Sequence, residues 1–324
     1  MPMITGRPVI DAPSLLNWPL DGEVVHPNLH DPGANVLYDL HGAVTESDLL
    51  LSSEGNYHMA LREVWPQVLA KFKDDPLRNP LYTTSPPVVL PQLQQGVLQF
   101  DNLLLCCKPS VVVANHGVID KLAAQNHVGA AIHPLYQDRG LVILVQRGNP
   151  KNIRGVWDLG NQDVRLITPH PELEPGTYQN YSDAIYNIAK ADAFPPQTVS
   201  AERLFDVIFN GASGDPLKWL AGPRIHHRDL PWSVAYGRAD AAVMLYHIAL
   251  HTQRAFPALF DIVPLGGSID NPQPLRGTKI DTRYVAEIKG EWTPKQRAAQ
   301  QALIDTLLSA DFTRALEKHG LRRP

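Results

Sequence analysis

The chain has 324 residues, 44% of them hydrophobic and 19% charged, which is typical of a globular protein with room for two domains. A formal net charge of -4 argues against a nucleic-acid-binding protein, which needs a strongly basic surface. No apolar run approaches the roughly 18 residues that a membrane-spanning helix requires.

Residues 1–44 are rich in Pro, Gly, Asn and Asp and show no helical period, so we expect an extended arm. The arm contains His26, His30 and His41, and histidine is a common metal ligand. Pro27 argues against a helix that would bring His26 and His30 to one face. We therefore predict no metal site and no cofactor.

Residues 48–72 follow a strand–loop–helix pattern. Leu49 to Leu51 form a short apolar run, and apolar residues from Leu61 to Phe72 repeat at helical spacing. Ser53 and Asn56 lie in the polar turn between these elements. That is where open α/β sheets bind ligands, although both residues could equally cap the helix.

The same alternation continues along the chain. Residues 81–85, 111–114, 141–145 and 163–168 are predicted strands, and Thr84 and Ser85 lie at the end of the first. A helix is expected from about residue 118, and Gly176 to Tyr178 open another. Alternating strands and helices favour parallel α/β sheets. Cys106 and Cys107 are adjacent, so neither a disulfide nor a zinc site is expected.

The stretch from Arg224 to Tyr246 contains the triplet His226, His227 and Arg228. We expect this triplet in a loop, followed by a helix that begins at Pro231 and ends at Gly237, and then by a buried strand. Basic residues beside a helix N-terminus are typical of an anion site, because free N–H groups and the helix dipole favour negative charge. A basic surface loop explains the same pattern.

The last 65 residues predict two more strands and two helices. The strands are expected at 260–265 and within 278–288. Thr293-Pro294-Lys295-Gln296 is a capping box with proline at the first helical position. Ser309 is expected to cap a final helix that ends at Gly320.

Several stretches resemble the type II periplasmic substrate-binding proteins of ABC importers, nearest to the molybdate- and tungstate-binding branch and its uncharacterised relatives. The stretches are G-L-V-I-L-V-Q-R-G-N-P at 140–150, P-E-L-E-P-G-T-Y at 171–178, G-R-A-D-A-A-V at 237–243 with Tyr246, and the terminal helix pair. The resemblance covers about residues 48–321. It implies an α/β fold with two lobes, each a mostly parallel sheet flanked by helices, joined by two crossover strands.

The resemblance also implies a division of the chain and a set of ligand-binding residues. We expect the arm at 1–44, lobe one at 45–135 plus 265–324, and lobe two at 136–264, with a small anion held in the cleft between the lobes. Where this chain has Ser53-Glu54-Gly55-Asn56-Tyr57 and Ser85-Pro86-Pro87, the molybdate binders have other residues. The expected ligand is therefore either a molybdate- or tungstate-like oxyanion or a small organic anion paired with Arg228. The residues expected to bind the ligand by this resemblance are Ser53, Asn56, Tyr57, Thr84, Ser85, Thr177, Tyr178 and Tyr246. His226, His227 and Arg228 are not part of the simple molybdate site, and they are added because of their basic pattern at a helix start.

Function follows from the same resemblance. We expect a solute receptor that partners an ABC permease, acts as a monomer and has no catalytic residues. The alternative is a cytoplasmic enzyme or ligand sensor on the same fold that uses His226, His227 and Arg228, because fold alone does not decide function. The family implies a periplasmic or extracellular location. The first residues lack the pattern of a signal peptide, which leaves the cytoplasm as the alternative.

Overall fold

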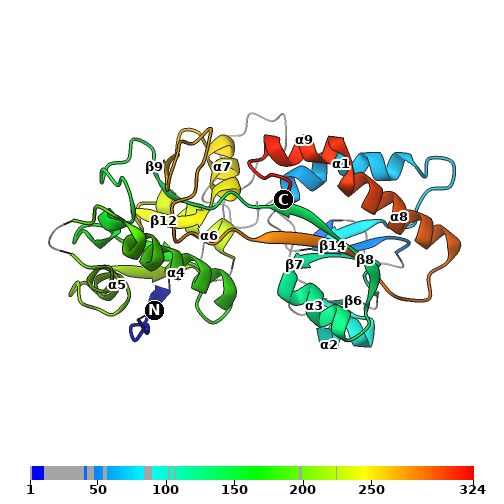
Figure 1. Ribbon diagram of the computed structural model, residues 1–324, viewed down its shortest axis with the longest axis horizontal. Coiled ribbons are helices and arrows are strands. Elements are labelled where there is room, and N and C mark those ends of the chain that lie inside the picture. The colour runs from blue at the N-terminus through cyan, green and yellow to red at the C-terminus, as the bar shows by residue number, and fades with distance from the viewer. Residues whose placement is uncertain are drawn as a thin grey trace. The chain divides into compact units, whose positions relative to one another are not determined.

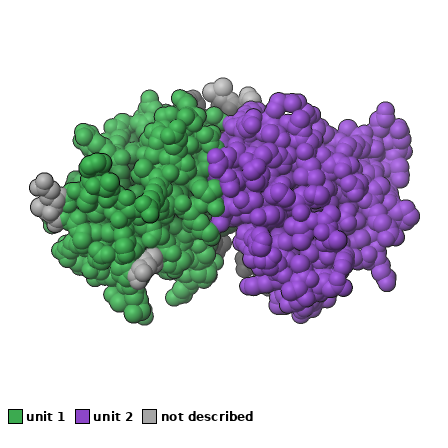
Figure 2. All heavy atoms as spheres, in the orientation of Figure 1, with its two compact units in different colours: residues 1–37, 139–280 green, residues 38–138, 281–324 purple. Residues whose placement is uncertain are grey.

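The chain divides into two compact units (Figure 2). Unit 1 comprises residues 1–37 and 139–280, and unit 2 comprises residues 38–138 and 281–324. The sequence predicted lobe boundaries at 135/136 and 264/265. In the structure, residues 265–280 belong to unit 1, whereas the sequence had placed them with the lobe that corresponds to unit 2. The computed structural model describes residues 2–10, 40–41, 47–53, 57–83, 90–100, 103–105, 107–196, 199–223 and 225–324.

Unit 1 is built on a six-stranded sheet in the order β1-β11-β10-β12-β9-β13, of which Figure 1 labels β9 and β12. β1, β11, β10 and β12 run parallel, whereas β9 is antiparallel to both β12 and β13. Its strands are β1 (Val9–Ile10), β9 (Leu141–Gln146), β10 (Leu166–Thr168), β11 (Trp219–Ala221), β12 (Ala241–Leu245) and β13 (Phe260–Pro264). Its helices are the 3-10 helix η2 (Val156–Gly160), α4 (Pro175–Ala191), α5 (Ala201–Phe209), α6 (His226–Ala235) and α7 (Tyr246–Ala255).

The core of unit 1 follows from its two most apolar runs. Residues 141–145 and 241–245 are almost completely buried, and the two strands pair over their whole length. A strand buried on both faces must read as a continuous apolar run, because each face of the sheet is covered by helices. The aromatic rings of α4 and α5, among them Tyr181, Phe205 and Phe209, complete this core.

The strand order of unit 1 reverses beside β10. From β10 the chain passes through α4 and α5 to β11 on one side, and from β11 it returns through α6 to β12 on the other side. Because such crossovers are right-handed, α6 covers the opposite face of the sheet from α4 and α5. A reversal of this kind opens a crevice at the carboxyl ends of the parallel strands, where open α/β sheets bind their ligands.

Unit 2 is built on a second six-stranded sheet, in the order β2-β4-β3-β7-β14-β8, with a two-stranded ribbon of β5 and β6. β4, β3 and β7 are parallel, and the other pairings are antiparallel. Its strands are β2 (Leu40–His41), β3 (Leu50–Ser53), β4 (Leu81–Thr83), β5 (Leu98–Phe100), β6 (Leu103–Leu105), β7 (Val111–Asn115), β8 (Val128–Gln137) and β14 (Thr282–Ile288). Its helices are α1 (His58–Ala70), α2 (Leu90–Gln95), α3 (His116–Ala124), α8 (Pro294–Leu308) and α9 (Ala310–Lys318).

Both sheets are therefore mixed, and they form the two-lobed α/β fold that the sequence predicts. The expectation of mostly parallel sheets describes unit 1 better than unit 2, where β14 enters antiparallel between β7 and β8. The predicted capping box at Thr293 is confirmed, since its hydroxyl accepts the Gln296 N–H at 3.2 Å and the Gln296 side chain accepts the Thr293 N–H at 3.0 Å. Among the described residues, no helix is long and apolar enough to cross a membrane.

Candidate functional site

Three parallel strands of unit 1 end at one edge of its sheet, and each is followed by a helix that carries predicted residues. α4 follows β10 and carries Thr177 and Tyr178 in its first turn. α6 follows β11 and begins at His226. α7 follows β12 directly and begins at Tyr246. The residues predicted for this lobe thus lie at the starts of three helices, next to the reversal in strand order.

The start of α6 corrects the sequence-based prediction. His226, His227 and Arg228 form the first helical turn, not a loop before it, and Pro231 lies inside the helix. Asp229 explains the earlier start, because its carboxylate accepts the Ile225 N–H at 2.8 Å. This reaches back across the first turn as a capping residue does. The predicted end is confirmed, since the helix stops at Ala235 and Gly237 has a left-handed φ of 66°.

Glu174 occupies the N-terminus of α6. One of its carboxylate oxygens accepts the His226 backbone N–H at 2.9 Å, and the other lies 2.7 Å from the His226 Nδ1. The two side chains are only 20% and 7% exposed. A carboxylate in this position satisfies an N–H group that has no partner within the helix, and it meets the positive end of the helix dipole. The chain itself thus shows that this helix start binds a carboxylate.

The rest of the triplet lies beside this pair. His227 and Arg228 are half-buried in the same turn, and the rings of His226 and His227 lie 5.3 Å apart, edge to face. The Nε2 of His226 is buried and makes no hydrogen bond to any described residue. Two imidazoles and a guanidinium are therefore carried by the first turn of one helix, and all three groups can donate hydrogen bonds.

Tyr178 lies beneath the start of α4. Its ring stacks on Trp219 with centroids 5.9 Å apart, and the Trp219 Nε1 donates to the hydroxyl of Thr168 at 2.9 Å. The Tyr178 hydroxyl oxygen is closed off from solvent, and burial raises the pKa of this group. Thr177, next to it, is half-buried. In this conformation Tyr178 packs in the core, and Thr177 is the more accessible of the two.

Two tyrosines connect the start of α7 with its surroundings. Tyr181 of α4 accepts the backbone N–H of Leu245 at 3.3 Å, and its ring lies edge to face 5.8 Å from His226. The Tyr246 hydroxyl donates to the carbonyl of Ile269 at 2.6 Å, and the Arg139 guanidinium lies 5.9 Å from its ring centroid. These contacts bring α4, α6 and the end of β12 together. They also show that the chain itself already uses the Tyr246 hydroxyl proton.

The residues predicted in unit 2 lie around the ends of β3 and β4. Ser53 is buried, and its backbone N–H donates to the hydroxyl of Thr83 at 3.0 Å. Tyr57 is fully buried, with its ring 4.9 Å from that of Tyr136. Asn56, Thr84 and Ser85 lie outside the described residues, as do His26 and His30. Within the described part of the chain, no cluster of three or more potential metal ligands occurs.

Sequence reasoning missed Glu174 and Tyr181, which hold the edge of unit 1 together. Glu174 stands directly before Pro175 at a helix start, a position where acidic residues are common. That signal places Glu174 at the N-terminus of its own helix, α4. Its actual partner is α6, 52 residues further along the chain.

A family model described as bacterial extracellular solute-binding protein matches residues 108–322, which is more than half of the chain. The chain belongs to this family. Binding proteins of this kind deliver small ligands to ABC permeases, and the family is one of binding proteins rather than enzymes. The predicted class of protein is therefore confirmed. No curated protein matches the sequence.

Solved structures support the same fold. Peb3 from Campylobacter jejuni superposes with a TM-score of 0.51 at 16% identity, covering 85% of this chain and 100% of Peb3. The sulfate-binding protein SubI from Mycobacterium tuberculosis gives 0.54 at 16% identity, covering 85% and 86% of the two chains. The periplasmic molybdate-binding protein of Azotobacter vinelandii gives 0.52 at 11% identity, covering 85% and 99%. At these identities the likeness establishes the fold and leaves the ligand open.

Proposed function

We propose that this solute-binding protein captures a small anion at the start of α6. The observation that carries the proposal is the carboxylate of Glu174, which is held there by a backbone N–H and by an imidazole. The positive end of the α6 dipole and the positive charge of Arg228 favour an anion beside this turn, at groups other than the His226 N–H that Glu174 already occupies. His227 and Arg228, half-buried in the same turn, are the proposed ligand contacts.

A small organic anion with a carboxylate or phosphonate group fits these groups better than a bare oxyanion. A guanidinium can bind such a group through two parallel hydrogen bonds. Oxyanion sites built from neutral donors use hydroxyl and backbone N–H groups, and at this edge the Tyr246 hydroxyl donates to Ile269 while the Tyr178 hydroxyl is buried. Molybdate, tungstate and sulfate remain in the test because relatives of this fold are named for molybdate and sulfate.

The other predicted residues take secondary places in this proposal. Thr177 lies in the first turn of α4, on the chain segment that also carries Glu174, and is a further proposed contact. In unit 2 the hydroxyl of Ser53 and the side chains of Asn56, Thr84 and Ser85 remain proposed ligand groups. Tyr57 in unit 2 and Tyr178 in unit 1 are proposed to support the ligand groups of their own units from the core.

A thermal-shift screen with molybdate, tungstate, sulfate, phosphate, acetate, succinate and methylphosphonate tests the proposal. An anion at 100 times its dissociation constant should stabilise the protein by about 2.7 kcal/mol. Arg228→Ala should then weaken that anion by about 1.5 to 3 kcal/mol, which is roughly 10- to 150-fold.

Arg154→Ala is the matched control, because Arg154 is an exposed arginine of the same unit whose side chain bonds to no described residue. This change should leave the affinity unchanged. The proposal is wrong if no anion stabilises the protein, or if Arg228→Ala binds the stabilising anion as tightly as Arg154→Ala does. A response to molybdate or tungstate alone, with Arg228→Ala unaffected, would instead indicate an oxyanion receptor that uses other groups.

A further inference from the structure

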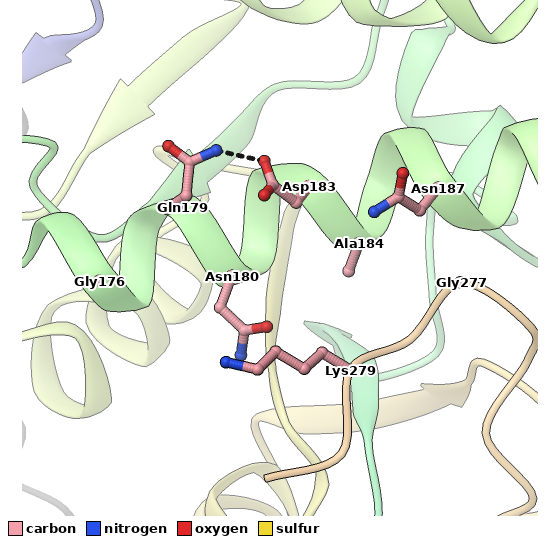
Figure 3. A pocket seen from close by; sticks show the side chains of 8 residues that line it. All are labelled: Gly176, Gln179, Asn180, Asp183, Ala184, Asn187, Gly277 and Lys279. Carbon is pink, nitrogen blue, oxygen red and sulfur yellow. Dashed lines mark hydrogen bonds between the residues drawn. The ribbon is translucent and has the colours of Figure 1, made fainter. Parts of the chain in front are cut away.

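A pocket lies along α4, and none of the residues at the start of α6 lines it. It occupies about 260 Å³ between one face of α4 and the segment 277–279, which leads toward the boundary between the units at 280/281. Both walls belong to unit 1. Six positions of α4 and two of the facing segment line it (Figure 3): Gly176, Gln179, Asn180, Asp183, Ala184, Asn187, Gly277 and Lys279.

Two glycines shape this pocket. Gly277 has a left-handed φ of 104°, and a Cβ atom there would lie 2.5 Å from the backbone of Asn187. Only glycine can therefore bring the segment so close to α4. At the other end, a Cβ on Gly176 would meet nothing within 4 Å. The segment 277–279 therefore lies close against α4 at Gly277, whereas space remains beside Gly176.

Five of the lining residues have polar side chains, and two of these are carboxamides without a hydrogen-bond partner among the described residues. The carboxamides of Asn180 and Asn187 make no hydrogen bond to any described residue. Asp183 accepts a hydrogen bond from Gln179 through one of its two oxygens. In Figure 3, Lys279 and Asn180 point toward one another along the lower edge of the α4 face that lines the pocket, whereas Gln179 and Asp183 lie along its upper edge. The two sides of the pocket therefore carry opposite charges.

We propose that this pocket binds a small zwitterion that carries an ammonium and a carboxylate group. The carboxylate would lie against Lys279 and Asn180, and the ammonium would lie against Asp183, with Asn187 available to either. Each charged group of the ligand would then meet an opposite charge and a carboxamide, which makes charge-assisted hydrogen bonds. Burial raises the pKa of Asp183, and a bound ammonium would offset that effect.

Other ligand classes fit the pocket less well. A simple anion would meet the carboxylate of Asp183, and a simple cation would meet Lys279. A sugar would find amide and carboxylate groups, but none of the eight lining residues is aromatic, so no ring is present on which its apolar face could pack. This site goes beyond the proposed anion site, because it uses none of the residues at the start of α6.

Isothermal titration calorimetry with glycine, β-alanine and 4-aminobutyrate tests the proposal, because the three compounds separate the same two charges by increasing distances. Propionate and propylamine are the singly charged controls. We expect at least one zwitterion to bind and both controls to fail. Lys279→Gln and Asp183→Asn should each weaken that zwitterion at least tenfold, which corresponds to about 1.4 kcal/mol. Gly176→Leu should weaken it too, because a Cβ there meets nothing within 4 Å and the larger side chain would take up space at the open end of the pocket.

Lys121→Gln is the control for loss of a positive charge, because Lys121 is an exposed lysine of α3 in unit 2. It should bind the zwitterion like the wild type. The proposal is overturned if no zwitterion binds, if propionate or propylamine binds as tightly, or if Lys279→Gln binds like Lys121→Gln. Arg228→Ala should leave zwitterion binding unchanged, so failure of the anion proposal and failure of this one can be told apart.

Discussion

The first N–H groups of a helix need hydrogen-bond acceptors, and these acceptors have different origins at the start of α3 in unit 2 and at the start of α6 in unit 1. α3 follows β7 directly, and its N-cap residue Asn115 accepts the Val118 N–H at 3.0 Å. The N-cap residue of α6 is Ile225, which has no side chain able to accept a hydrogen bond. Glu174, from another helix, supplies the missing acceptor. One helix start is completed by its own sequence and the other by tertiary structure.

The difference matters for function. A helix start that a neighbouring residue caps is a closed structural unit, because its free N–H groups are used locally. At α6 the cap is a charged group from a distant part of the chain, the N-cap residue of α4, and it is paired with the His226 imidazole. Glu174 and His226, which are 52 positions apart in the sequence, meet at the edge of unit 1 where open α/β sheets bind ligands. We therefore look for function at α6 rather than at α3.

The largest expected effect on stability concerns Lys218, a buried charged residue that bonds to a distant part of the chain. It is 2% exposed and donates to the carbonyls of Asn161 and Val164, which follow η2, at 2.5 Å each. Burial lowers its pKa from 10.5 to about 8. Between these values the unfolded chain keeps the proton that the folded protein loses, so stability should rise with pH. The gain should reach at most about 3 kcal/mol between pH 8 and 10.5.

Urea unfolding of the wild type and of Lys218→Met across this pH range measures the effect. The wild type should gain stability relative to the variant as the pH rises, because methionine does not titrate. Lys121→Met, at an exposed position, should track the wild type. Parallel pH profiles for wild type and Lys218→Met would contradict the lowered pKa.

Glu174→Ala should have the next largest effect. It leaves the His226 N–H and the imidazole without their acceptor in a buried position, which should cost about 2 to 3 kcal/mol of stability. Chemical denaturation measures the loss. Glu172→Ala is the control, since Glu172 is exposed and its carboxylate contacts no described residue. Equal stabilities for the two variants would mean that α6 does not depend on its distant cap.

Asn115→Ala should have the smallest effect of the three. Loss of a local N-cap typically costs about 1 kcal/mol. Asn115→Ser and Asn115→Asp should recover most of that loss, because both side chains cap well. Hydrogen exchange of the Val118 amide reports directly on the cap. A loss as large as that of Glu174→Ala would remove the distinction between the two helix starts.

The sequence predicted most of the fold because its signals were local. The apolar runs at 141–145 and 241–245 became buried strands, and Gly237 ended its helix as expected, with a left-handed φ. Short or weakly patterned strands were missed, above all β8 and β11. β11 has only three residues, and β8 alternates irregularly between buried and exposed positions. Neither length nor period identifies such a strand before its neighbours are in place.

The candidate site shows where that limit lies. The sequence by itself determined that His226, His227 and Arg228 adjoin a helix and that Tyr246 follows a buried strand, because spacing and apolar runs act over a few residues. Only the tertiary structure decided that Glu174 caps this helix and that the Tyr246 hydroxyl bonds to Ile269. These contacts join residues 23 to 52 positions apart. Their partners are chosen by the packing of strands and helices, which no local pattern records.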